Sequence, residues 1–146
     1  MTKDLNHLAA RMERLAGLVE TSASRLAVAG VRAAVRELVY VTPVDTSEAL
    51  SNWQVSLNAP PAVNIPPYYP GIKGSTRRSS AEQAINEAEA ALTVKEPGQT
   101  LFLYNLTPYI KRLDEGSSSQ FAGGFVPRAL ISFRVAVEEA RKTLFS

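Results

Sequence analysis

The sequence contains no cysteine, and its only histidine is His7. The chain therefore has no disulfide bonds, no thiolate metal ligands and no cysteine nucleophile. Its cysteine content does not distinguish an oxidising from a reducing compartment. A zinc site would have to be built from carboxylates alone, which is rare. His7 lies near the start of a predicted helix and outside its apolar seam, where we expect a solvated side chain. We expect neither a metal nor a cofactor.

Long apolar runs are also absent. No stretch approaches the roughly 18 uncharged apolar residues that span a membrane, and the charged N-terminus lacks the apolar centre of a signal peptide. The pair Gly123-Gly124 lacks the Lys-Ser/Thr signature of a phosphate-binding loop. No serine has the spacing of a nucleophile elbow. We therefore expect a protein that is not an enzyme and does not enter a membrane.

The overall composition is that of one globular domain. The 146 residues are 45% hydrophobic and 21% charged, and the net charge of +2 is too small by itself to indicate a nucleic-acid partner. Basic residues nevertheless recur on the predicted first helix: Arg11, Arg14, Arg25, Arg32 and Arg36. They form either a solvated face interspersed with glutamates or the phosphate-contacting face of a small nucleic-acid-binding module.

The first 41 residues predict one long helix, which ends before Pro43 because proline disfavours helical backbone in the preceding residue. Its apolar residues alternate at intervals of three and four, as in a narrow helix-pairing seam. They are Leu5, Leu8, Met12, Leu15, Val19 and Leu26. A second stripe begins out of phase with the first and consists of Val28, Val31, Val35 and Leu38.

Such a helix is too long for a compact domain of this size. It would span roughly 55 Å or more at about 1.5 Å per residue, against a radius of gyration of about 15 Å. It therefore either projects from the domain or breaks near Gly17 or Gly30. We favour projection into a neighbouring subunit. The alternative is two antiparallel helices within one core.

The middle of the chain alternates between short elements and an extended arm. Asp45 or Thr46 can cap a short helical turn, and residues 52–57 alternate as a half-buried strand. Residues 58–80 carry five prolines and two tyrosines, which indicates an extended arm that packs on something or a mobile surface loop. Ser79 and Glu82 then match a capping box at the start of a helix.

Residues 100–106 predict a second strand, antiparallel to the first and apolar on both faces, which suggests a central, covered position. A helical turn over 109–113, a glycine- and serine-rich loop over 114–124 and a final helix beginning at Pro127 follow. The expected fold class is therefore α+β: a small antiparallel sheet packed by middle and C-terminal helices. We divide the chain into the long helix, residues 1–41, and an α+β core domain, residues 42–146, with its arm at 58–80.

Two motifs, in this order along the chain, resemble those of a protein family found in tailed bacteriophages. Thr42-Pro43-Val44-Asp45-Thr46 followed by Trp53 is similar to the first motif of the phage tail-component family, whose members are tail completion or head–tail joining proteins. The second motif is similar in order and spacing, and runs through Tyr104-Asn105, Pro108-Tyr109, Glu115-Gly116, Ser119-Gln120 and Gly124-Phe125-Val126. The chain departs from the family at Ser47, where glycine is usual, and at residues 121–123.

The resemblance implies a structural virion protein without catalysis. Family members assemble as rings at the neck between head and tail, around the DNA channel, so the implied self-association is a hexamer or dodecamer. The implied partners are portal or adaptor proteins and tail or tail-tube proteins. Genomic DNA would pass nearby without sequence-specific binding. The implied location is the virion neck or tail, with the host cytoplasm during assembly.

The residues that we expect at subunit interfaces lie in the arm and in the late loop. They are Tyr68, Tyr69, Arg77, Arg78, Asp114, Glu115, Gly116, Ser119, Gln120 and Gly124. A third hypothesis, a hydrolase or metal enzyme around Asp114 and Glu115, lacks the alternating acidic positions of a calcium loop.

Overall fold

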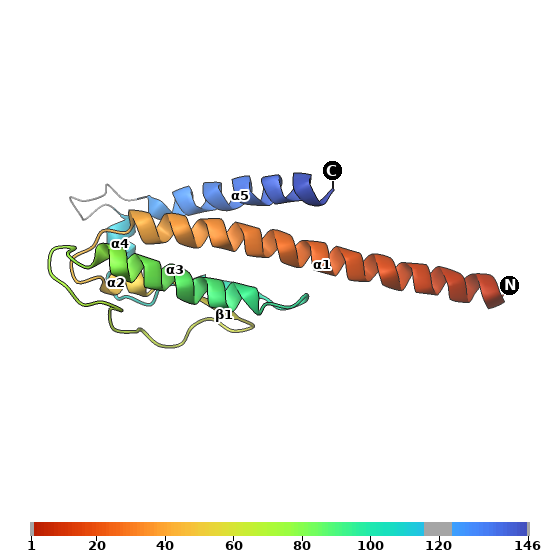
Figure 1. Ribbon diagram of the computed structural model, residues 1–146, viewed down its shortest axis with the longest axis horizontal. Helices are drawn as coiled ribbons and strands as arrows, with labels where there is room; N and C mark the ends of the chain where they lie inside the picture. The colour runs from red at the N-terminus through yellow and green to blue at the C-terminus, as the bar shows by residue number, and fades with distance from the viewer. Residues whose placement is uncertain (1, 116–123, 146) are drawn as a thin grey trace.

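The computed structural model describes residues 2–115 and 124–145, with side chains of the first helix described from Asp4 onward. Helix α1 is unbroken from Thr2 to Val41. It lies along the long axis of the molecule, and its N-terminal half extends beyond every other element (Figure 1). The predicted projection is confirmed, and the alternative of two antiparallel helices within residues 2–41 is wrong. Contact with a neighbouring subunit stays a prediction.

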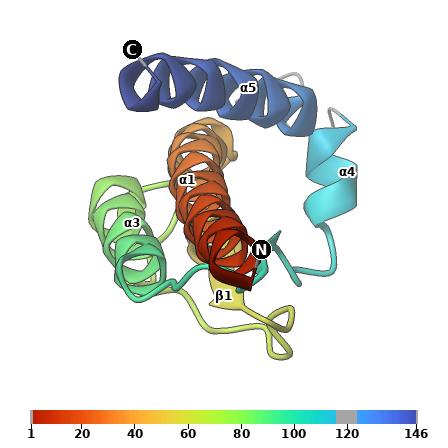
Figure 2. The ribbon, with the colours of Figure 1, turned by 90° about the vertical axis from the view of Figure 1, so that its right-hand side faces the viewer.

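The remaining elements gather around the second half of α1. Helix α2 spans Glu48–Ser51, strand β1 Gln54–Leu57, helix α3 Arg77–Thr93, strand β2 Leu101–Tyr104, helix α4 Ile110–Asp114 and helix α5 Phe125–Leu144. The two strands pair antiparallel, with Val55 opposite Leu103. Viewed along α1, α3 and α5 flank the helix, and the strands lie below it (Figure 2). The α+β fold class is confirmed.

The two out-of-phase stripes of α1 face two different neighbours. The second stripe faces the main core, where Val35 and Leu38 are buried at 1% and 4% exposure. The first stripe continues through Gly30 beneath α5, where the ring of Phe133 lies so close that a Cβ on Gly30 would approach it to 2.4 Å. The phase shift between Ser22 and Gly30 therefore marks a change of neighbour along a continuous helix.

The core is shared between residues 1–41 and 42–146. The largest buried apolar side chains come from α1, the α1–α2 turn, α2 and α5, and the buried Trp53 meets Phe125 edge to face at 6.0 Å between ring centroids. The inner face of α3 contributes Ala81, Ala84, Ile85, Ala88 and Leu92, all buried. The second half of α1 is thus an integral part of the core.

Three local predictions are wrong, each for a physical reason. Helix α3 begins at Arg77, so Ser79 of the expected capping box lies inside the helix, and Glu82 pairs with Arg78 at 3.2 Å. Helix α5 begins at Phe125, because its cap is supplied from α4 by Asp114. Strand β2 is not central: in the described residues the sheet has two strands, and Tyr104 is 43% exposed.

The spacing of apolar residues in the final helix predicts an inner face of Leu130, Phe133, Val137, Ala140 and Leu144, and the structure differs from it at one position. Leu130, expected to face inward, is 53% exposed, and Phe125 and Ala129 are the buried residues of this helix. Phe133, Val137, Ala140 and Leu144 are partly buried, as the pattern indicates. The inner face of α5 is shifted from the predicted one because the helix packs with the ring of Phe133 against the backbone of Gly30.

The proline-rich arm packs on its own domain. The side-chain amide of Asn52 exchanges two hydrogen bonds with the backbone of Ile65, at 2.8 and 2.7 Å. The hydroxyl of Ser51 accepts the N–H of Tyr68 at 3.1 Å, and that of Ser80 accepts the N–H of Tyr69 at 3.1 Å. These bonds replace the ladder that prolines cannot form. The arm is therefore a fastened segment of the domain, and the alternative of a mobile loop is not supported.

Candidate functional site: a joint between two sequence motifs

The first motif forms the turn that joins α1 to α2. The indole N–H of Trp53 donates to the hydroxyl of Thr42 at 2.7 Å, and that hydroxyl donates in turn to the carbonyl of Leu38 in the last turn of α1. Thr42, Pro43 and Val44 are all buried. The motif therefore fixes the direction in which the chain leaves α1.

Of the two predicted caps of α2, Asp45 and Thr46, Asp45 does not cap the helix. Its carboxylate accepts the N–H of Lys73 at 2.6 Å, and its carbonyl accepts the N–H of Gly74 at 2.9 Å. The hydroxyl of Thr46 accepts the N–H of Glu48 at 3.4 Å, a long capping bond. Asp45 thus holds the tight turn that precedes α3, and Gly74 supplies the positive φ of 78° which that turn requires.

Ser47 occupies a left-handed backbone position. Its φ is 73°, and its side chain is buried against Thr76, with 2.9 Å between the two hydroxyl oxygens. A non-glycine residue in this region is strained. The hydrogen bond between Ser47 and Thr76 compensates for this backbone strain.

The second motif meets the first at α2. The side chain of Asn105 donates to the carbonyl of Ala49 at 2.7 Å and accepts the N–H of Thr107 at 3.0 Å. The phenol of Tyr109 donates to the carboxylate of Glu48 at 3.5 Å. Partial burial, followed by the charge of Glu48, raises the pKa of Tyr109, so that the phenol keeps its proton at neutral pH.

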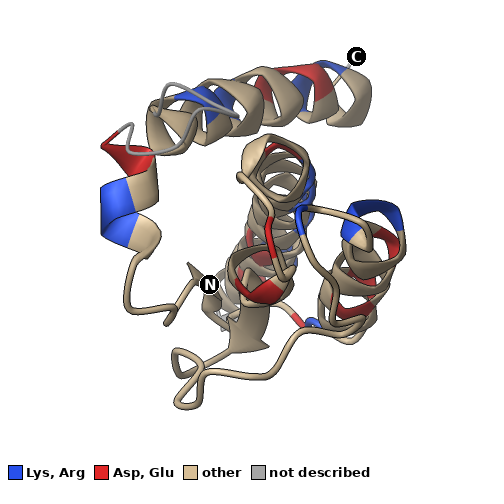
Figure 3. Ribbon diagram, turned by 90° about the vertical axis from the view of Figure 1, so that its left-hand side faces the viewer, with Lys and Arg blue, Asp and Glu red and all other residues tan. Residues whose placement is uncertain are grey.

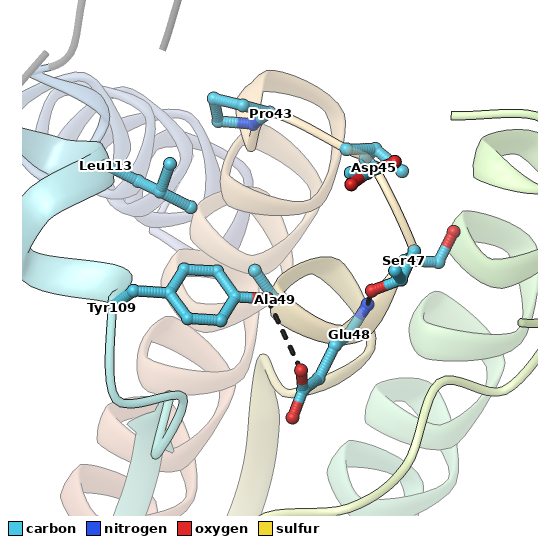
Figure 4. A pocket seen from close by; sticks show the side chains of 9 residues that line it. Pro43, Asp45, Ser47, Glu48, Ala49, Tyr109 and Leu113 are labelled. Atoms are coloured by element: carbon cyan, nitrogen blue, oxygen red, sulfur yellow. Dashed lines mark hydrogen bonds between the residues drawn. The ribbon is translucent and has the colours of Figure 1, made fainter. Parts of the chain in front are cut away.

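The two motifs enclose a pocket of about 400 Å³ (Figure 4). Residues 43–49 form one wall, and Tyr109 and Leu113 of the second motif form the other. The carboxylate of Asp45 is engaged by Lys73, and Glu48 is engaged by Tyr109 and by the amide of Asn64 at 3.0 Å. Because its polar groups are bonded within the protein, this pocket is a joint between segments.

Arg77 and Arg78, expected at an interface, have different environments. Arg77 donates to the carbonyls of Tyr40 and Thr42 at 3.1 and 3.2 Å and so supplies the cation at the C-terminus of α1, whose own last turn has none. Arg78 points into solvent with its side chain 93% exposed and pairs with Glu82. Tyr68 is half-buried, which raises the pKa of its phenol, whereas Tyr69 is 47% exposed.

The ends of the late loop meet at the start of α5. The carbonyl of Asp114 accepts the N–H of Gly124 at 2.8 Å, and its carboxylate accepts the N–H of Val126 at 3.3 Å. Gly124 has a φ of 74°. Asp114 is therefore a cap of α5, which leaves the metal-enzyme hypothesis without its principal residue. Glu115 is exposed, and Gly116, Ser119 and Gln120 lie outside the described residues.

The arginines of α1 do not form an uninterrupted basic face. Arg32 pairs with Glu89 of α3 at 2.7 Å, and Arg36 approaches the same carboxylate at 3.9 Å. Basic and acidic segments occur together on the helices (Figure 3). Among the described residues, no three histidine or carboxylate side chains lie close enough to share a metal ion, and no helix has the length and hydropathy of a membrane span.

Several contacts at this joint carry no signal in the sequence. Ser51, Asn52 and Ser80 fasten the arm, and an isolated polar residue near a proline-rich segment does not reveal its partner.

Comparison with protein-family models, with curated proteins and with solved structures finds no match for this chain.

Proposed function

We propose that this chain is a structural virion protein of a tailed bacteriophage, a subunit of an oligomeric ring at the neck, where head and tail join around the DNA channel. One observation supports the proposal above the others. Asn105 and Tyr109 of the second motif form hydrogen bonds to Ala49 and Glu48 of α2, 56 and 61 positions earlier in the sequence. Helix α2 lies between Thr46 and Trp53 of the first motif. Residues that resemble one family in order also act together as one joint.

The shape of the subunit is consistent with this role. Helix α1 is about 60 Å long at 1.5 Å per residue, and only its second half is used by the core. A ring subunit uses such an extension to contact its neighbours or the adjoining ring. The proposed partners are further copies of this chain, a portal or adaptor protein and a tail or tail-tube protein.

Mass spectrometry of purified virions tests the proposal. We expect the chain in stoichiometric amounts in complete particles and, in particles made without it, separated heads and tails. Complete, infectious particles that lack the chain would contradict the proposed function. Substituting Glu115 by Lys is expected to impair joining and to leave the isolated fold intact, because Glu115 is exposed.

A small nucleic-acid-binding module is the second candidate, and it depends on the arginines of α1. Glu89 neutralises Arg32 and lies close to Arg36, which weakens this candidate. Binding to duplex DNA at two salt concentrations separates the two functions, because phosphate contacts give a steep salt dependence. We expect weak binding; tight, steeply salt-dependent binding would favour the module.

A further inference from the structure

The projecting half of α1 exposes a continuous apolar stripe. Its members, the N-terminal stripe, are each between 51% and 67% exposed: Leu5, Leu8, Met12, Leu15 and Val19. Their spacing of three and four residues is that of a helix-pairing seam, which needs only two positions in seven. Large exposed apolar surfaces on a soluble chain mark interaction sites. The stripe is therefore an exposed apolar surface with the spacing suited to pairing with another helix.

The same stripe is already covered by a helix in the second half of α1. There α5 lies antiparallel to α1, Phe133 packs on Gly30, and Arg128 pairs with Glu37 at 2.8 Å (Figure 1). The N-terminal stripe continues this α5-facing surface without a change of phase, since α1 is one unbroken helix. Its partner therefore lies where α5 would lie if α5 were longer.

The end of α5 leaves an open apolar groove at this boundary. The groove has a volume of about 430 Å³, and it is lined by Phe145 and by residues of α1: Leu15, Leu18, Val19, Ser22, Ala23 and Leu26. Ser22 stands at the seam position where a large apolar residue would continue the repeat. The small serine leaves room for a large side chain from outside the molecule.

We propose that two copies of the free protein pair through their N-terminal stripes, with the two α1 helices antiparallel. In the register that matches the seam, Leu8 faces Val19 of the second copy, and Met12 faces its Leu15. Leu5 of the second copy then faces Ser22 and fills the groove beside Phe145. Within residues 2–115 and 124–145, no other element reaches the N-terminal part of this stripe, because the straight α1 carries it away from its own domain (Figure 1).

Sterics and charge both select the antiparallel orientation. A parallel partner would bring its own α5 and core onto the part of the seam that α5 already covers. In the antiparallel register, the flanking residue Asp4 lies opposite Arg25 of the second copy, and both are exposed. The other flank carries alanines at seven-residue intervals, with Ala9 opposite Ala16 of the second copy, which permits close approach. The pairing thus matches apolar, small and charged positions together.

This inference does not rest on the virion assignment. A twofold contact is complete with two copies, whereas a ring requires head-to-tail contacts. The antiparallel pair is consequently a state of the free protein, and it must open before the N-terminal stripe can contact other subunits.

Engineered cysteines test the pairing, because the chain has none of its own. The full chain should have twice its 15.8 kDa mass in solution. The double variant Leu8→Cys/Val19→Cys should form disulfide-linked dimers under mild oxidation, and Leu8→Cys alone should not. Leu15→Asp should halve the mass and leave the helical circular dichroism unchanged, since Leu15 is 59% exposed. Ala10→Asp, on the opposite side of the helix, is the matched control and should stay dimeric.

Three results would overturn the proposal. One is a single-chain mass at every concentration tested. Another is rapid cross-linking of Leu8→Cys alone, which would indicate a parallel pair. The third is a parent assembly larger than two copies that Leu15→Asp dissolves, which would indicate a head-to-tail contact. Virion content is measured separately, so failure of the pairing and failure of the proposed function are distinguishable.

Discussion

The indole N–H of Trp53 lies 2.7 Å from the hydroxyl oxygen of Thr42, and both residues are buried. This hydrogen bond joins the end of α1 to the residue that precedes β1. It gives a structural reason for a threonine and a tryptophan eleven residues apart in one motif. The direction of α1 relative to the sheet depends on this contact.

Substituting Trp53 by Phe should destabilise the fold by about 2–3 kcal/mol, through the lost hydrogen bond and the lost contact volume. Thr42→Val should cost about 1–3 kcal/mol, because the indole N–H is then buried without an acceptor. Urea unfolding followed by circular dichroism measures both changes. Thr42→Ser keeps the hydroxyl and is the control; equal losses in Thr42→Ser and Thr42→Val would contradict the role of the hydrogen bond.

Ser47 provides a second test, through its left-handed backbone at φ 73°. Ser47→Gly and Ser47→Ala both remove the hydrogen bond to Thr76, but only glycine relieves the backbone strain. Ser47→Gly should therefore be more stable than Ser47→Ala by about 1 kcal/mol. Thermal unfolding of the pair measures the difference, and a more stable alanine variant would be inconsistent with this backbone conformation.

The two glycines of α1 should respond in opposite directions. Gly30→Ala places a methyl group against the ring of Phe133 and should destabilise the α1–α5 contact by about 1–3 kcal/mol. A Cβ on Gly17 would meet no atom within 4 Å, so Gly17→Ala should raise the helicity and stability of the projecting half by up to about 1 kcal/mol. Hydrogen exchange along α1 locates both effects. If Gly30→Ala were as well tolerated as Gly17→Ala, α5 would not pack at Gly30.

Adjacent arginines at the start of α3 form another matched pair. Arg77→Ala should lower the free energy of unfolding by about 1–2 kcal/mol, because the terminal carbonyls of α1 lose their cation. Arg78→Ala should change it by less than about 0.5 kcal/mol, as expected for an exposed pair with Glu82. Denaturant midpoints of the two variants give the comparison. A larger loss at Arg78 would exclude the proposed capping of α1.

The sequence predicts the elements that depend on local pattern. Pro43 and the apolar spacing give the end of α1, and the alternation around Val55 gives β1, whose predicted antiparallel pairing with the second strand is confirmed. The spacing of Ala81, Ile85, Ala88 and Leu92 likewise predicts the inner face of α3, and all four residues are buried. These features depend on periodicity, which one segment carries by itself.

The features that were missed depend on partners distant in the chain. Asp114 caps α5 across the late loop, and Ser80 is buried because the backbone of Tyr69 needs an acceptor. The shift of phase in α1 reads as a possible break, but it arises because α5 and the main core cover different sides of one helix. Such relationships require the fold to be known.

Electron cryomicroscopy of intact particles of a phage that encodes this chain tests the proposed function most directly. We expect a ring of copies at the neck, around the DNA channel, with density in each copy for a helix of about 60 Å and for α5 packed along its second half. A neck fully occupied by other chains, with this chain absent from the particle, would contradict it.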